Sequence, residues 1–137
     1  GEVVIHRYMA VQDSGRRINP MIVEGQMQGG IVHGMGNALF ERLHHDETGQ
    51  PLTNSLDQYL LPTSSSVPSI SLHYDETACS KNPLGIKGVG EGGTVPVPAV
   101  IISAVEDALS PFGIAIDRCP IEPMRIVEMI QEARRIS

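Results

Sequence analysis

The sequence predicts a mixed α+β fold of helices and short strands. Apolar residues recur every four positions over residues 21–43, which is the spacing of one face of a helix. The apolar run at residues 97–109 and the amphipathic segment at residues 123–135 also predict helices. Residues 2–12 and 69–74 instead intersperse apolar with polar side chains at a shorter period, which indicates strands. Together these patterns predict a single structural unit of mixed helices and short strands.

The first predicted helix has the clearest start signal in the chain. Asn19 is a favourable N-cap, and Pro20 suits the first helical position because its missing N–H is not needed there. The helix nevertheless carries five glycines, each of which costs it about 1 kcal/mol relative to alanine. They are Gly25, Gly29, Gly30, Gly34 and Gly36. We expect close packing to compensate, either of backbone against backbone or of backbone against a ligand. Gln26 is then free to hydrogen-bond that ligand or to remain a surface side chain.

The remaining predicted elements are less regular. Residues 56–61 and 113–117 are further candidate strands because apolar residues cluster in them. Residues 97–109 are apolar on all sides until near their end, so we expect that helix to be buried.

Composition excludes several function classes. The net charge of −6 argues against a nucleic-acid-binding surface, for which a basic stripe is needed. Cys79 and Cys119 are too few and too unpatterned for a disulfide framework or a cysteine metal site, so we expect a reducing, cytoplasmic environment. No apolar run approaches the roughly 20 residues that span a bilayer, so we expect no membrane association.

Histidines mark two further candidate sites. The run His44-His45-Asp46 is similar to a metal-ligand cluster, but adjacent histidines rarely bind one ion well, and Gly49 follows closely. We therefore interpret this run as a solvated turn. His33, inside the glycine-containing helix, is interpreted as a packed or exposed side chain and not as a metal ligand.

The densest glycine cluster lies at residues 84–94, which contain five glycines and a single acid, Glu91. Glycine allows the backbone to adopt positive φ angles and to approach another group closely. One interpretation is a loop that wraps a ligand and presents Glu91 to it as a base. The other is a tight connection before the next helix, with Glu91 in solvent. The residues alone leave both open.

The same loop contains the dinucleotide-binding pattern G-x-G-x-x-G, at Gly88, Gly90 and Gly93. That pattern has its meaning only between a strand and a helix of a βαβ unit. The preceding residues 79–83 do not have the pattern of a strand, and Glu91 would bring a negative charge to the pyrophosphate. We therefore reject a nucleotide-binding domain.

Three segments in fixed order carry a family resemblance. They are RINPMIVEGQ at residues 17–26, LDQYLLP at residues 56–62 and GIKGVGE at residues 85–91. Together they resemble the C-terminal part of the molybdopterin-binding large subunit of the xanthine dehydrogenase, aldehyde oxidase and aerobic carbon monoxide dehydrogenase family. The resemblance implies a mixed α and β segment of a larger molybdenum-binding domain.

The resemblance also implies roles for four residues. In that family the glutamate of the glycine loop lies beside the molybdenum and acts as the base, and Glu91 matches it. The glutamine in the glycine helix lies near the molybdopterin, and Gln26 matches that residue. Gly88 and Gly90 correspond to loop glycines next to the cofactor, and no residue of this chain is expected to ligate the metal directly.

The implied cofactor is molybdenum–molybdopterin in its cytosine dinucleotide form, bound only together with the upstream half of the subunit. Iron–sulfur and FAD groups would reside on partner subunits or domains. Residues 1–137 would then be a fragment of a longer subunit, inactive in isolation. The alternative is a non-catalytic truncated domain that pairs with another chain. In either case we expect exposed apolar surface and self-association of the isolated chain. The substrate is not predictable, because the residues that choose it lie outside this chain.

Overall fold

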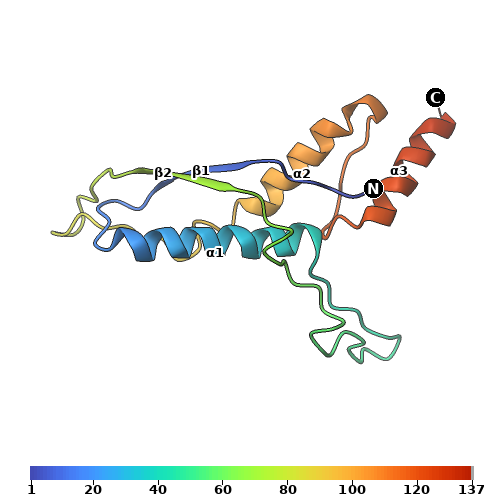
Figure 1. Cartoon of the computed structure of the whole chain (residues 1–137), viewed down its shortest axis with the longest axis horizontal. Helices are drawn as coiled ribbons and strands as arrows, with labels where there is room; N and C mark the ends of the chain where they lie inside the picture. The colour runs from blue at the N-terminus through green and yellow to red at the C-terminus, as the bar shows by residue number, and fades with distance from the viewer. Residues whose placement is uncertain (137) are drawn as a thin grey trace.

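A two-stranded sheet lies along the length of one long helix, and two further helices pack at one end (Figure 1). This computed structural model describes residues 1–136. The elements are β1 (Tyr8–Asp13), α1 (Pro20–Leu39), β2 (Ile70–Asp75), α2 (Val97–Ala108), the short 3-10 helix η1 (Ser110–Phe112) and α3 (Pro123–Ile136). The mixed α+β class predicted from the sequence is confirmed.

The two strands run parallel, with register from Tyr8 opposite Ile70 to Asp13 opposite Asp75. Parallel neighbours cannot be joined by a tight turn, and α1 supplies the long crossover that they require. One face of the sheet packs on the core through Tyr8, whereas Met9 on the opposite face is 61% exposed. The sheet therefore covers α1 on one side and leaves its own outer face open.

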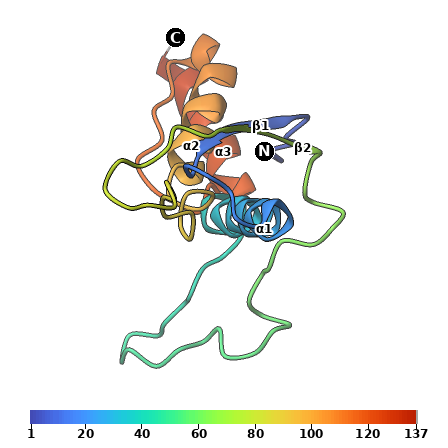
Figure 2. The ribbon, with the colours of Figure 1, turned by 90° about the vertical axis from the view of Figure 1, so that its left-hand side faces the viewer.

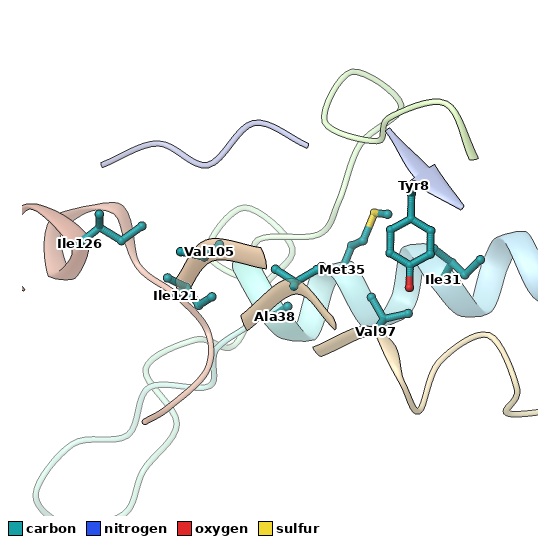
Figure 3. Packing of buried hydrophobic residues seen from close by; sticks show 9 residues of the cluster. Tyr8, Ile31, Met35, Ala38, Val97, Val105, Ile121 and Ile126 are labelled. Carbon is teal, nitrogen blue, oxygen red and sulfur yellow. The ribbon is translucent and has the colours of Figure 1, made fainter. Parts of the chain in front are cut away.

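The start of α1 follows from its sequence. The side chain of Asn19 accepts a hydrogen bond from the backbone N–H of Ile22 at 3.2 Å, so the predicted N-cap is confirmed. Side chains at the predicted spacing of four, among them Met27, Ile31 and Met35, are at most 2% exposed. Ile31 and Met35 belong to a core cluster with residues of β1, α2 and the segment before α3, as Figure 3 shows. The helix ends at Leu39 and not at residue 43.

Two of the helix glycines are contact points with the segment that leads into α2. A Cβ on Gly34 would lie 2.5 Å from Cβ of Val97 and 2.9 Å from the carbonyl oxygen of Thr94. A Cβ on Gly30 would lie 3.0 Å from Oγ1 of Thr94. The expectation of close packing is confirmed at these positions, because a side chain here would separate α1 from α2.

Residues 40–69 leave the body as a long irregular arm (Figures 1 and 2). The predicted strand at residues 56–61 is wrong. The backbone N–H groups of Gln58 and Tyr59 both donate to the carbonyl of Ser55 and form a turn, and no strand lies beside them to pair with. An apolar cluster without a neighbouring strand cannot form a sheet.

Three other predictions need correction. Residues 113–117 form no strand, because Gly113 adopts a left-handed conformation and the N–H of Ile116 donates to a carboxylate oxygen of Glu106 at 2.7 Å. The first strand begins only at Tyr8, where its partner β2 also begins. Helix α2 is buried on one face and not on all sides, since Val100 is 50% exposed.

Helix α3 has its predicted position. No helix within residues 1–136 has the length and apolar character needed to cross a membrane.

Candidate functional site

The glycine-rich loop at residues 84–94 is fixed to the end of β1. The backbone N–H of Lys87 donates to the carbonyl oxygen of Ser14 at 2.8 Å. In return, the N–H of Arg16 donates to the carbonyl oxygen of Gly85 at 3.0 Å. The first half of the loop is thereby held by the turn that follows β1.

An ion pair reinforces this attachment. Nζ of Lys87 lies 2.6 Å from Oδ2 of Asp13, and Oδ1 of Asp13 accepts the N–H of Gly15 at 2.9 Å. The Lys87 ammonium, and secondarily the Gly15 N–H, hold the pKa of the Asp13 carboxyl down at about 2. Gly15 itself has φ of +64°, a conformation that glycine adopts without strain.

The second half of the loop lies against α1. A Cβ on Gly93 would lie 2.6 Å from the carbonyl oxygen of Met27, so this glycine permits the backbones to touch. Three residues earlier in the loop, Nε2 of Gln26 donates a hydrogen bond to the carbonyl oxygen of Gly90 at 2.6 Å, across 64 positions of sequence. Gln26 and the loop around Glu91, which the sequence placed in separate motifs, are therefore neighbours in the fold.

A pocket of about 310 Å³ lies where α1 meets the loop. It is lined by Gln26, Gly29, Gly30, His33, Gly90, Glu91, Thr94 and Val95. Glu91 is exposed, and its carboxylate forms no hydrogen bond or ion pair within residues 1–136. A ligand in the pocket and bulk water can both reach it, so each of the two interpretations of this loop remains compatible with the geometry.

Four glycines of α1 and the loop, of which Gly29 and Gly90 line the pocket, have open space where a side chain would stand. Gly25, Gly29, Gly88 and Gly90 have no atom within 4 Å of the place where a Cβ would stand. Unlike Gly34, they are not required by contacts inside the described chain. At these glycines the backbone is exposed beside the Gln26 amide and the Glu91 carboxylate, in space that larger side chains would fill. Such a surface suits a bulky cofactor that must approach the main chain closely.

His33 also lines the pocket, although its sequence context did not mark it as a site residue. It stands seven positions, or two helical turns, after Gln26 and therefore on the same face of α1, with Gly29 between them. This spacing was the signal that could have identified it. Gly88, which was selected, lies in the loop but is not among the residues that line the pocket.

The other histidine run forms the turn that was predicted. Oδ1 of Asp46 accepts hydrogen bonds from the N–H groups of Thr48 and Gln50, at 2.8 and 2.9 Å. Within the described part of the chain no group of three or more His, Cys, Asp or Glu side chains is placed to hold a metal ion.

A larger hollow, of about 1100 Å³, lies elsewhere. It is an open groove between the N-terminal segment, α2 and α3, lined mainly by apolar side chains such as Val4, Val100 and Ile130. None of the candidate site residues borders it, so volume alone does not identify the site.

Comparisons with known proteins bear on the whole chain. Residues 1–68 match the sequence family described as a molybdopterin cofactor-binding domain. The nicotine 6-hydroxylase large subunit of Paenarthrobacter nicotinovorans is 41% identical over 93% of this chain, and the carbon monoxide dehydrogenase large chain of Hydrogenophaga pseudoflava is 34% identical over 96% of it. The chain spans 16% of the length of each of these relatives.

The fold leads to the same group of proteins. The structure of quinoline 2-oxidoreductase from Pseudomonas putida 86 matches 90% of this chain with a TM-score of 0.87 at 45% identity, and the match covers 16% of that structure's chain. The sequence comparison and the structure comparison therefore point to the same proteins over nearly all described residues. The chain belongs to the molybdopterin-binding large-subunit family of xanthine dehydrogenases, aldehyde oxidases and carbon monoxide dehydrogenases, of which it represents a segment.

Proposed function

We propose that this chain is a segment of a molybdenum hydroxylase large subunit and that it contributes the general base, Glu91, and part of the molybdopterin site. The observation that supports this most is the shared pocket. Gln26 on α1 and Glu91 on the loop line one cavity together with Gly29 and Gly90, whose Cβ positions have no atom within 4 Å. The proposal explains why helix-destabilising glycines occur where internal packing does not need them.

Gln26 and the bare glycines are the residues that would hold the cofactor. The Gln26 amide offers hydrogen bonds at the pocket wall, and Gly88 and Gly90 leave the loop backbone open to close approach. The cofactor we propose is molybdenum–molybdopterin in its cytosine dinucleotide form, bound only together with the upstream half of the subunit. When bound, it supplies the redox chemistry, while the protein supplies position and proton transfer.

Glu91 would accept a proton on its carboxylate during oxidative hydroxylation. A base must reach the reacting group directly, and Glu91 is exposed at the pocket with no competing partner in the described chain. The backbone before it is held by Gln26 through Gly90, and the backbone after it by the contact of Gly93 with α1. The carboxylate is therefore free while its backbone is fixed.

The substrate class we propose is an aldehyde, an N-heterocycle or a similar small molecule, with carbon monoxide oxidation as the other family chemistry. The relatives named above include a nicotine hydroxylase, a carbon monoxide dehydrogenase and a quinoline oxidoreductase, so similarity does not choose among these substrates. The partners that this proposal requires are the upstream half of the subunit and iron–sulfur and flavin subunits or domains, in the cytoplasm.

Glu91→Gln in the assembled enzyme tests the proposal. The amide is nearly the same size and leaves the loop glycines unchanged, so the molybdenum and pterin content should be retained. Loss of a general base should slow the single-turnover reduction of the molybdenum by substrate about 10²–10⁴-fold. Glu47→Gln, which neutralises an exposed acid on the arm, is the matched control and should have no effect. Full metal loading with an unchanged reduction rate would refute the catalytic role.

A non-catalytic piece that pairs with another chain is the second candidate. The open apolar groove beside α2 favours it, because such a surface requires a cover. This alternative predicts that Glu91→Gln leaves both assembly and turnover of the complex unchanged.

A further inference from the structure

We propose that the ion pair between Asp13 and Lys87 positions the loop that carries Glu91. This inference rests on the proposed function, since it concerns the placement of the base. Asp13 and Lys87 would be positioning residues, acting on the reaction only through the loop. The pair joins the last residue of β1 to the residue four positions before Glu91.

Lys87 is held at two points by the same stretch of chain. Its ammonium contacts Asp13 at 2.6 Å, and its backbone N–H donates to the carbonyl oxygen of Ser14 at 2.8 Å. Asp13 is oriented in turn by the N–H of Gly15 at 2.9 Å. The pair is about one-third exposed on both sides, so solvent weakens it without removing it.

The chain between Lys87 and Glu91 needs such an attachment. It reads Gly88-Val89-Gly90, and neither glycine has a neighbour within 4 Å of its Cβ position. Glycine loses more conformational freedom on ordering than any other residue, so this link is flexible unless its ends are fixed. The far end is fixed where Gly93 touches α1. The ion pair, together with the backbone hydrogen bond of Lys87, fixes the near end, and the hydrogen bond from Gln26 to Gly90 holds the residue directly before Glu91.

The charge state of the pair suits this role. The pKa of Asp13 lies at about 2, so its carboxylate stays ionised at any pH at which the enzyme would be assayed. The groups facing it are the Lys87 ammonium, the Gly15 N–H and Thr77. Loss of the attachment therefore requires mutation or high salt and not a change of pH near neutrality.

The test uses the enzyme assembled with its cofactor and four variants. Asp13→Asn and Lys87→Gln remove the ion pair, and Lys87→Arg preserves it. Glu122→Gln breaks the remote pair with Arg42, which is also partly exposed, and serves as the matched control. Hydrogen exchange is followed by mass spectrometry on peptides covering residues 84–94, together with molybdenum content, kcat and KM.

We expect exchange in residues 84–94 to become about two- to fivefold faster in Asp13→Asn and Lys87→Gln. That change corresponds to about 0.4–1 kcal/mol at 1.36 kcal/mol per tenfold, the range of a partly exposed ion pair. Lys87→Arg and Glu122→Gln should exchange at the wild-type rate. Where Glu91 acts as base, kcat should fall by at least the same factor in the two pair-breaking variants, with KM and molybdenum content unchanged.

Unchanged exchange in both pair-breaking variants would overturn the proposal, whatever the kinetics show. A rise in KM with kcat unchanged would also overturn it, because that pattern indicates a lost binding contact and not a displaced base. Failure of the proposed function is recognised separately, by Glu91→Gln leaving turnover intact. In that case the exchange measurement still decides whether the pair holds the loop.

Discussion

Gly34 and Gly29 lie on the same helix but should respond in opposite ways to the same substitution. Alanine at either position gains about 0.8–1 kcal/mol of helix propensity. At Gly29 nothing lies within 4 Å of the new methyl group, so this gain should appear in full as stability of the apoprotein. At Gly34 the methyl group would stand 2.5 Å from Cβ of Val97, far inside the 3.5–4.0 Å of an ordinary contact.

The magnitude at Gly34 follows from which atoms would have to move. Cβ of Val97 cannot rotate away, and the carbonyl oxygen of Thr94, at 2.9 Å, belongs to the backbone. Overpacking of this kind costs about 1–3 kcal/mol. Because the propensity gain is common to both variants, their unfolding free energies should differ by about 1–3 kcal/mol, with Gly29→Ala the more stable protein.

Urea unfolding of the two apoproteins, followed by far-ultraviolet circular dichroism, measures this difference. The denaturant slope must stay the same in both variants for the midpoints to report stability. Equal midpoints would refute the packing argument. A second measurement separates stability from function. In the assembled enzyme Gly29→Ala should retain less molybdopterin than wild type despite its greater stability, because the methyl group occupies the bare wall of the pocket.

Three further outcomes are expected. Lys87→Met should raise the pKa of Asp13 from about 2 toward its ordinary 3.8 in a carbon-13 NMR titration; an unmoved titration would show that Lys87 is not the cause. Since the folded-state pKa is depressed, the stability that Asp13 contributes is present above about pH 4 and is lost as the pH falls toward 2. The chain alone should not retain molybdopterin in equilibrium dialysis, because the bare glycines need the rest of the subunit to enclose a ligand; stoichiometric, sub-micromolar retention would contradict this. The isolated chain should self-associate through its exposed apolar surface, and a monomer at high concentration in analytical ultracentrifugation would count against it.

Elements with local signals were predictable from the sequence. The start of α1 depends on Asn19 and Pro20, two adjacent residues, and the structure forms the N-cap that they predict. The strand predicted at residues 56–61 does not form, because a strand depends on contacts that are not local in sequence. A strand needs a partner, and the arm carries these residues away from the sheet. Pairing depends on distant parts of the chain, which local patterns do not describe.

The candidate site depends on distant contacts in the same way. Gln26 and Gly90 meet across 64 positions, and Asp13 and Lys87 across 74. From the residues alone Gln26 could be a surface side chain and Glu91 a solvated acid, and only the family resemblance linked them. His33 lies on the same face of α1 as Gln26, but its other neighbours on the pocket wall come from the loop before α2 and are distant in sequence.

The glycines show what the structure adds to the sequence. From the sequence alone, the glycines of α1 and of the loop cannot be told apart, and each could permit another group to approach the backbone closely. The structure distinguishes two groups among them. Gly30, Gly34 and Gly93 pack closely against other residues of the described chain. A side chain at any of them would push α1 away from the segment that leads into α2. A second group has no such contact, and it consists of Gly25, Gly29, Gly88 and Gly90. The cost of Gly25 and Gly29 to helix α1 is not offset by contacts within the described chain, and the proposed cofactor would offset it. The proposed ligand surface rests on this group of glycines and not on the glycine motif as a whole.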